Sequence, residues 1–270
     1  MDSASSILAA YAARAPWLDK DTVDRLIFGD PEKPVHKLLV TWQADEASIT
    51  FAGAHKYDAL MVHEPTFWFH RDEWDNVQAL PDDSAKKRAA LTKAAQLERF
   101  GLVVLRNHDV WDAMPEVGIP WAWAAHLELR GRPTATRIRG MMHRYDLAPR
   151  LLAEFAAHIS RRTALLGDIP PAVFGNPAAV IRTVGIGTGC ITDMDEFAAM
   201  GCDVAVVCDD GSAYWHDVAW ALETGLAVIR VSHGTSEEPG MMTLAKSAEC
   251  MFPECEVGYF PHSLHISTPV

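Results

Sequence analysis

Three short segments of the chain place histidine and carboxylate residues directly after apolar runs. They are residues 58–67 (DALMVHEPTF), 107–112 (NHDVWD) and 232–239 (SHGTSEEP). Imidazole and carboxylate groups are the ligands expected for Zn, Fe, Mn or Co. His233 and Glu237 stand four residues apart, so both lie on one side of a helical turn and could share a metal ion. The three segments together predict a metal site.

Each segment by itself also has a simpler interpretation. A single histidine at the end of a strand is more often a capping residue or a neighbour of ligands than a ligand itself. His63 and Glu64 do not begin an H-E-x-x-H zinc helix, because Phe67 stands where the second histidine is required and Pro65 would disrupt the helix. The pattern alone therefore leaves metal binding and a structural role open.

The elements that must position these segments are short apolar strands alternating with helices, which predicts an α/β fold. Ligands of open α/β sheets bind beyond the carboxyl ends of the strands, where His63, His108 and His233 are expected. The predicted strands are residues 36–42, 58–62, 102–105, 180–187, 203–208, 227–232 and 256–260, and the predicted helices are residues 5–14, 20–28, 45–54, 84–100, 147–164, 193–200, 215–224 and 241–250.

The composition narrows the possible partners. The chain has 270 residues and a net charge of −12, which argues against general binding to nucleic-acid phosphates. No apolar run is long enough to span a bilayer, and the N-terminus lacks a basic signal region, so we expect a cytoplasmic protein without a membrane partner. The cysteines are odd in number and form no CxxC motif, which favours free thiols in a reducing compartment.

The glycine run at residues 185–189 (GIGTG) has two interpretations. It falls short of the G-x-G-x-x-G dinucleotide fingerprint, because residue 190 is cysteine and the third glycine is not at the required spacing. A tight turn before a helix is the favoured interpretation.

The three histidine segments, taken in order, resemble motifs of the Nif-three-like dinuclear metal centre hexameric proteins, whose bacterial members are often labelled GTP cyclohydrolase 1 type 2. The family's His-His-Pro motif corresponds to VHEPTFW here, and its His-Thr-Asn-x-Asp motif to residues 108–112. Its Gly-His-aromatic-x-Ser-Glu motif corresponds to residues 232–237, and its glycine turn to residues 185–189. The resemblance covers residues 20–260 and implies two interlocked α/β lobes, 1–130 and 131–270, with the metal site between them at strand ends.

The resemblance also implies which residues carry the chemistry. Asp112 and Glu237 would bridge two divalent ions, with His63 and His233 bound terminally. His108 matches a family position beside the metals, where it would shuttle protons. Asp210 and His216 resemble an acidic residue and a histidine of the family, although they could equally be a turn aspartate and a residue at the start of a helix. The implied metal ligands are His63, Glu64, Asp112, His233 and Glu237, and the implied catalytic residues are His108, His216 and Asp210.

One departure from the family pattern affects the metal. Glu64 stands where the family has its second histidine, so the ligand set becomes two imidazoles and three carboxylates. The additional oxygen ligand favours the harder ions Fe or Mn over Zn, and an oxygen-rich iron pair makes redox chemistry conceivable. Alternatively, Glu64 is a general base beside a single metal. Ser232 and Gly234 replace a glycine and an aromatic residue, which suggests a substrate different from that of typical members.

The function implied by the resemblance is that of a dinuclear metal-dependent hydrolase acting on a small molecule, such as a nucleotide or a heterocyclic ring. Two alternatives remain: a dinuclear iron redox enzyme, and a non-enzymatic metal-binding or regulatory protein. The resemblance also implies a homohexamer.

Overall fold

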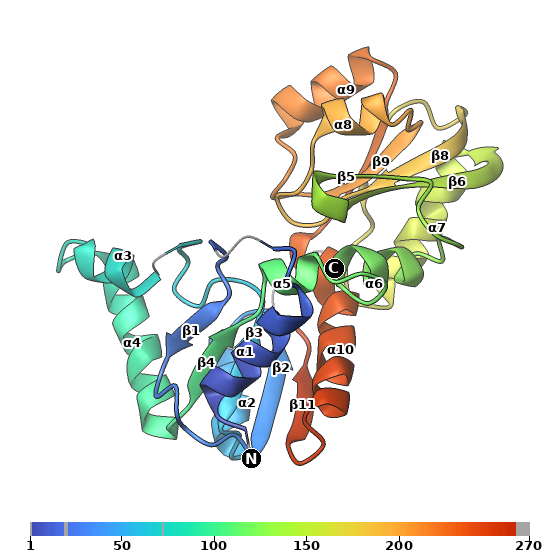
Figure 1. The fold of residues 1–270 in the computed structure, drawn as a ribbon. Coiled ribbons are helices and arrows are strands. Elements are labelled where there is room, and N and C mark those ends of the chain that lie inside the picture. Colours follow the sequence, from blue (N-terminus) through green and yellow to red (C-terminus); the bar gives the residue numbers. More distant parts are fainter. Residues whose placement is uncertain (1, 19–20, 72, 263–270) are drawn as a thin grey trace. The chain divides into compact units, whose positions relative to one another are not determined.

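The computed structural model describes residues 2–18, 21–71 and 73–262, and it confirms the α/β class. The described chain divides into two compact units, residues 1–114 with 241–263, and residues 115–240. The resemblance implied lobes of 1–130 and 131–270; in this division the first unit ends at residue 114 and also includes residues 241–263. Figure 1 shows the elements of each unit.

The first unit is built on a five-stranded sheet in the order β1-β4-β3-β2-β11. Four of its strands are parallel, and β1 pairs antiparallel with β4 at one edge. Thr41 pairs with Val62, and Val62 pairs with Arg106, so the next residues of β2, β3 and β4 emerge side by side. The strands are β1 (Arg25–Phe28), β2 (Lys37–Thr41), β3 (Ala59–Val62), β4 (Val103–Arg106) and β11 (Glu256–Phe260).

Helices of the first unit begin and end at ordinary capping residues. Asp45 caps α2, Ser84 caps α4, and Gly101 ends α4 in the left-handed conformation at φ 64°. Alternate residues of the sheet, among them Leu60 and Val104, form a buried core with α2 and α4. The helices are α1 (Ala4–Arg14), α2 (Glu46–Ala54), α3 (Glu73–Ala79), α4 (Ala85–Phe100) and α5 (Asp109–Asp112), and α1 packs against β1 and β4 (Figure 1).

The second unit is built on a six-stranded sheet in the order β5-β6-β8-β9-β10-β7. Its centre, β8-β9-β10, is parallel, and the pairs toward both edges are antiparallel. Cys208 pairs with Val231, so the residues after β9 and β10 also emerge side by side. The strands are β5 (Ala135–Arg137), β6 (Met142–Leu151), β7 (Ala172–Phe174), β8 (Val180–Ile186), β9 (Val204–Cys208) and β10 (Ala227–Val231).

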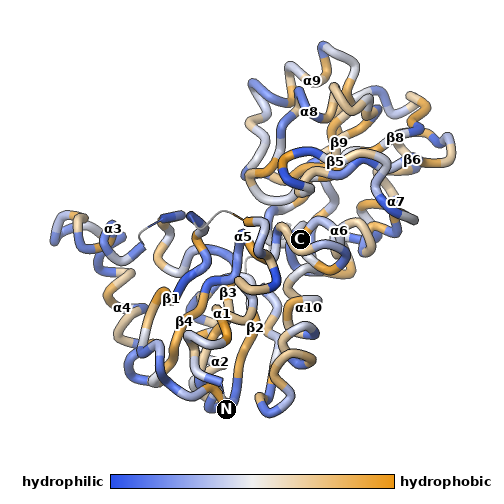
Figure 2. Tube along the Cα trace, viewed as in Figure 1, coloured by the Kyte–Doolittle hydropathy of each residue, from blue (hydrophilic) through white to orange (hydrophobic). Residues whose placement is uncertain are grey.

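Strands β3 and β9 are apolar along their length, and Figure 2 colours the chain by hydropathy. In the second unit, Phe155 and Ile159 lie one turn apart on α7 and pack against Val206 and Ile229 of the sheet. The remaining helices are α6 (Ile119–His126), η1 (Ile138–Gly140), α7 (Leu152–Ala164), α8 (Met194–Ala199), the π-turn η2 (Tyr214–Val218), α9 (Ala219–Glu223) and α10 (His233–Met251), which contains the boundary between the units.

Three predicted elements differ from the structure. Residues 20–28 do not form a helix: Arg25–Phe28 is strand β1, because its apolar residues pair with the edge of β4. The helix predicted from 147 begins only at Leu152, since β6 continues to Leu151. Helix α10 begins at His233 rather than near 241 and contains Pro239. None of the helices among the described residues is both long and apolar enough to cross a membrane.

Candidate metal centre

The site in the first unit begins with His63 at the end of β3. The ring is fully buried, and its Nδ1–H donates to the carbonyl of Asn107 at 3.4 Å, directly beyond β4. This bond places the ring proton on Nδ1, and Nε2 lies 3.6 Å from the Oδ1 of Asp112. The parallel register of β3 and β4 thus places an imidazole nitrogen opposite a carboxylate from α5.

His108 and Glu64 complete this group of side chains. The rings of His63 and His108 stack with their centroids 4.2 Å apart. His108 Nδ1 lies 3.3 Å from Asp112 Oδ2 and 2.8 Å from Asp109 Oδ1, and its Nε2 lies 3.7 Å from Glu64 Oε1. Two groups of potential ligands occur here, one of His63, Glu64 and His108, and one of His108, Asp109 and Asp112. Within each group the ligand atoms all lie within 4.8 Å of one another.

The electrostatics of this cluster favour a bound cation. Burial alone would lower the pKa of His108, but the carboxylates of Asp112, Asp109 and Glu64 outweigh it and raise that pKa well above its ordinary value. Burial acts on Asp109 in the opposite direction and would raise its pKa. The hydrogen bond with His108 opposes this, and the pKa of Asp109 is lowered to about 2. Three carboxylates around the imidazoles therefore attract positive charge, which a proton or a metal ion can supply.

Asp24 supports the segment that carries His108, a role not predicted from the sequence. Its Oδ1 accepts the backbone N–H of His108 at 2.6 Å and that of Val110 at 3.4 Å. Burial raises the pKa of Asp24, and the nearby charge of Asp109 raises it further. Its position one residue before β1 was hidden by the prediction of a helix over residues 20–28.

The loop after β3 is held by basic side chains, whose role was also not predicted from the sequence. Arg106 is buried and donates from Nε to the carbonyl of His63 at 2.8 Å and from a terminal nitrogen to that of His70 at 2.7 Å. Lys93 of α4 donates to the carbonyl of Thr66 at 2.7 Å, and burial lowers the pKa of Lys93 to about 8. These contacts fix the backbone that presents His63 and Glu64.

The site in the second unit lies at the start of α10. His233 Nε2 and Glu237 Oε1 are 3.0 Å apart, as expected for residues four apart on a helix. The backbone N–H of His233 donates to Asp209 Oδ1 at 2.7 Å, and Asp210 Oδ2 lies 3.6 Å from His233 Nδ1. The loop after β9 therefore contacts the histidine that follows β10.

Gly189 approaches this pair closely. Its φ is +54°, and a Cβ added there would lie 2.8 Å from Glu237 Oε1 and 3.0 Å from His233 Nε2. The glycine run is therefore a turn whose backbone needs the space beside the ligand atoms. A hydrogen in place of a side chain leaves room there for an ion held by His233 and Glu237.

The predicted site residues thus form a group in each unit. His63, Glu64, His108 and Asp112 come together in the first, and Asp210, His233 and Glu237 in the second. His216 lies in η2, is largely exposed, and its Nδ1 is 2.7 Å from Asp217 Oδ1, a hydrogen bond that lowers the pKa of Asp217. No set of potential ligands found among the described residues includes His216.

The fold and these groups define an α/β protein with histidine and carboxylate clusters that could hold metal ions. The sequence pattern of the Duf34/NIF3 (NGG1p interacting factor 3) family matches residues 3–263. The chain therefore belongs to the Duf34/NIF3 family, as the resemblance predicted.

Named relatives agree with this assignment. A protein of Neisseria meningitidis serogroup B named GTP cyclohydrolase 1 type 2 homolog is 30% identical over 226 residues, which cover 81% of each chain. A protein of the same name from Allochromatium vinosum is 25% identical over 217 residues, covering 80% of this chain and 78% of that one.

Solved structures share the fold. Protein ybgI, described as of unknown function, has a TM-score of 0.76 at 21% identity, with both chains fully covered. Reduced HcgD from Methanocaldococcus jannaschii has a TM-score of 0.74 at 17% identity, covering 97% of this chain and 98% of that one. These similarities extend over the whole α/β architecture.

Proposed function

We propose that this protein is a dinuclear metal-dependent hydrolase acting on a small molecule, such as a nucleotide or a heterocyclic ring. The observation that carries the proposal is the buried group at the ends of β3 and β4, where His63, His108, Glu64 and Asp112 converge. Buried carboxylates beside imidazoles are costly unless a cation compensates them. Membership of the Duf34/NIF3 family supports the same interpretation.

The proposed ligands are those that the family resemblance implies. Glu64 and Asp112 would contribute oxygen ligands and His63 its Nε2, and His233 Nε2 and Glu237 Oε1 would complete the set. Two observations support the fit of this set: the orientation of His63 by its Nδ1–H, and the space that Gly189 leaves beside the pair on α10. Three carboxylates favour Fe or Mn, with Zn as the softer alternative. Two such ions would lower the pKa of water and polarise the substrate.

His108 is the proposed proton carrier. Its Nδ1 lies within 2.8 Å of Asp109 Oδ1, so that carboxylate can hold the Nδ1 proton and orient the ring. Nε2 then remains to take a proton or deliver one, on the side where Glu64 lies 3.7 Å away. Asp210 would orient His233 through Nδ1, and His216 would be a second, more exposed proton carrier.

The names of the relatives support the proposed substrate class. GTP cyclohydrolase 1 type 2 homologs suggest attack on a ring carbon of a purine nucleotide, which is a hydrolysis. We also propose a homohexamer, supported by family membership. We propose a cytoplasmic location as well, with which the five free cysteines are consistent. The net charge of −12 argues against nucleic acid as a partner.

A dinuclear iron redox enzyme is the second candidate. The specific observation in its favour is Glu64 in place of a histidine, which makes the proposed ligand set rich in oxygen. Uptake of dioxygen by the iron-loaded protein, measured with a panel of reductants, would distinguish this function from hydrolysis. A metal-binding or regulatory protein would show neither activity.

The direct test is hydrolysis by the reconstituted protein. Wild-type protein is stripped of metal, reloaded with Mn or Fe, and incubated with GTP and related heterocycles while purine absorbance is followed. His108→Gln is compared with His36→Gln, which removes an exposed histidine that pairs with Asp58. We expect His108→Gln to keep its metal and to lose about 100-fold in turnover, and His36→Gln to lose nothing. Metal-loaded protein that hydrolyses none of these compounds contradicts the proposal, as does a fully active His108→Gln.

A further inference from the structure

A cavity of about 450 Å³ lies in the first unit, between α1 and the segment that follows β4. Its volume is within the range of sites that bind small organic molecules. The described residues that line it do not include His63, Glu64 or Asp112, so it is separate from the proposed ligands of that unit. The lining consists of Leu8, Ala9, Tyr11, Ala12, Ala15, Pro16, Leu18, Thr22, Asp24, Asn107 and Val110.

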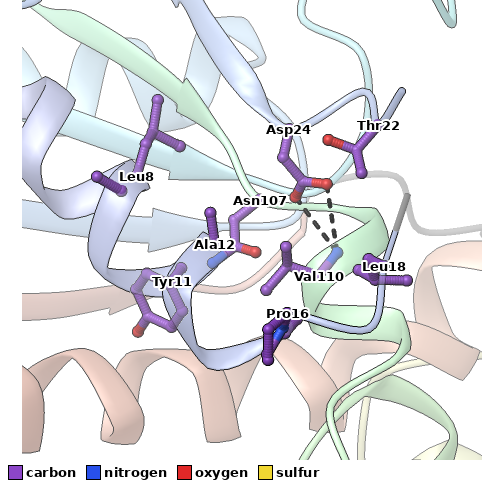
Figure 3. A pocket seen from close by; sticks show the side chains of 11 residues that line it. Leu8, Tyr11, Ala12, Pro16, Leu18, Thr22, Asp24, Asn107 and Val110 are labelled. Carbon is purple, nitrogen blue, oxygen red and sulfur yellow. Dashed lines mark hydrogen bonds between the residues drawn. The ribbon is translucent and has the colours of Figure 1, made fainter. Parts of the chain in front are cut away.

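Most of the wall is apolar. Leu8 and Ala12 of α1 face the cavity on one side, and Leu18 and Val110 bound it on the other, as Figure 3 shows. Ala12 is exposed, so the cavity is accessible from the surface along α1. A wall of this kind favours a ligand with a compact apolar body, because burial of apolar surface is the main source of its binding energy.

The polar end of the cavity is the carboxylate of Asp24. Its Oδ1 accepts from the backbone N–H groups of His108 and Val110, and its Oδ2 accepts from Val110 at 3.3 Å (Figure 3). These hydrogen-bond partners are neutral amides, and the charged groups that act on the carboxylate are His108, Arg106 and the like-charged Asp109. An ionised carboxylate offers about four acceptor positions, and among the described residues Oδ2 accepts only the long bond from Val110 that it shares with Oδ1.

We propose that this cavity binds a small molecule with an apolar body and a single protonated amine, whose ammonium donates a hydrogen bond to Asp24. The apolar wall accounts for the body, and the carboxylate at one end accounts for the cationic group. A carboxylate or phosphate ligand would meet the negative charge of Asp24 and is excluded from this end.

The position of Asp24 links such a ligand to the metal centre. The same carboxylate holds the backbone amides of His108 and Val110, and α5, which follows His108, ends at Asp112. A bound ammonium would therefore share its acceptor with the turn that presents His108. We expect ligand binding to shift the NMR signals of these amides, while the ligand itself does not contact the proposed metal ligands.

The test uses benzylamine as the probe, with benzyl alcohol and benzoate as its neutral and anionic analogues. Binding to the full-length, metal-free protein is measured by calorimetry, and amide shifts are mapped by NMR. Ala12→Phe fills the cavity, and Ala13→Phe is its matched control, since Ala13 is an exposed neighbour on α1 outside the lining. Asp24→Asn removes the charge with little change in shape.

We expect benzylamine to bind with a dissociation constant of about 1 mM or tighter, the range for a fragment of this size. Amide shifts should centre on Ala12, Asp24, His108 and Val110. Ala12→Phe should abolish binding and Ala13→Phe should not, while Asp24→Asn should weaken benzylamine about tenfold and leave benzyl alcohol unchanged. Equal binding of benzoate, no binding of benzylamine to the wild type, or unchanged binding to Ala12→Phe would each overturn the proposal. These readouts need no metal and no turnover, so they are independent of the hydrolase proposal.

Discussion

The two units present histidines at strand ends in the same way but surround them differently. In the first unit His63 is fully buried, and Asp112 and His108 pack against it from the segment after β4. In the second unit His233 lies at the start of α10, beside the buried carboxylate of Glu237 and the largely exposed one of Asp210. The parallel ends of a sheet are thus enough to gather such side chains, whether the rest of the support is a second loop or a helix.

The difference lies in how each group is held. The first is a dense cluster in which carboxylates already balance the charge of His108, and Asp24, Arg106 and Lys93 fix its backbone. The second depends on the four-residue spacing of His233 and Glu237 along one helix and on the absence of a side chain at Gly189. Substitutions in the second unit should therefore act on metal retention with little effect on folding.

The largest expected effect is that of Glu237→Ala. Removal of a proposed bridging carboxylate should abolish metal retention, because His233 then has no carboxylate partner on its own helix. The matched control is Glu249→Ala, which removes an exposed carboxylate of α10 that pairs with Lys246. Elemental analysis of both purified variants gives the answer, and unchanged metal in Glu237→Ala would show that the start of α10 is not a ligand segment.

A second prediction contrasts two buried histidines. Carboxylates raise the pKa of His108, whereas burial lowers the pKa of His143 to about 4, despite its hydrogen bond to the carbonyl of Gly140. His143 therefore stabilises the fold above its unfolded pKa of about 6.5, and this contribution is lost as the pH falls toward 4.

The expected loss from His143 is about 3 kcal/mol in the free energy of unfolding between pH 6.5 and 4. His143→Gln should remove this part of the pH dependence, and the surface variant His36→Gln should keep it. Urea unfolding of metal-free protein at several pH values measures both. If the slope in His143→Gln equals that of the wild type, another group is responsible.

A third prediction concerns the close approach of Gly189. Gly189→Ala should lower metal affinity about 10- to 100-fold, the range for changes beside the ligands, because its Cβ would press on Glu237 and His233. Gly201→Ala is a strict control, since Gly201 also has positive φ, +70°, but a Cβ there meets nothing within 4 Å. Both variants should lose about 1 kcal/mol of stability from backbone strain, and only the first should lose metal. Equal affinities in metal titrations would show that Gly189 has no role in the site.

The smallest expected effect is a change of metal preference. Glu64→His restores the pair of histidines typical of the family and replaces an oxygen donor with nitrogen. We expect the ratio of bound Zn to bound Mn or Fe to rise several-fold in competition experiments. An unchanged ratio would argue that Glu64 is not a ligand and would favour its alternative role as a general base.

Much of the architecture could be predicted from the pattern of apolar and polar residues within short segments. The apolar runs of β2, β3, β9 and β10 and the helical spacing of α4 were visible, and the histidines after the strands followed from them. The family model confirms the assignment that the three motifs predicted. Local sequence sufficed here because apolar runs and helical spacing are local signals, and ligands of open α/β sheets bind at the carboxyl ends of the strands.

The features that were not predicted depend on contacts between residues far apart in the sequence. Strand β1 exists because it pairs with β4, about 80 residues away along the chain, so Arg25–Phe28 carried no clear local signal and Asp24 was overlooked. Arg106 ends a buried strand and was not expected to bind the loop after β3. The approach of Gly189 to Glu237 depends on the folded sheet and could not be seen in the spacing of the glycines.

The proposed metal centre is tested by the metal content per chain of protein purified without an affinity tag. We expect about two equivalents of Fe or Mn by elemental analysis, with both lost on mutation of Glu237. One equivalent would reduce the centre to a single metal with Glu64 beside it. Protein that retains no metal, even after reconstitution with Fe, Mn or Zn, would contradict the proposed dinuclear metal centre.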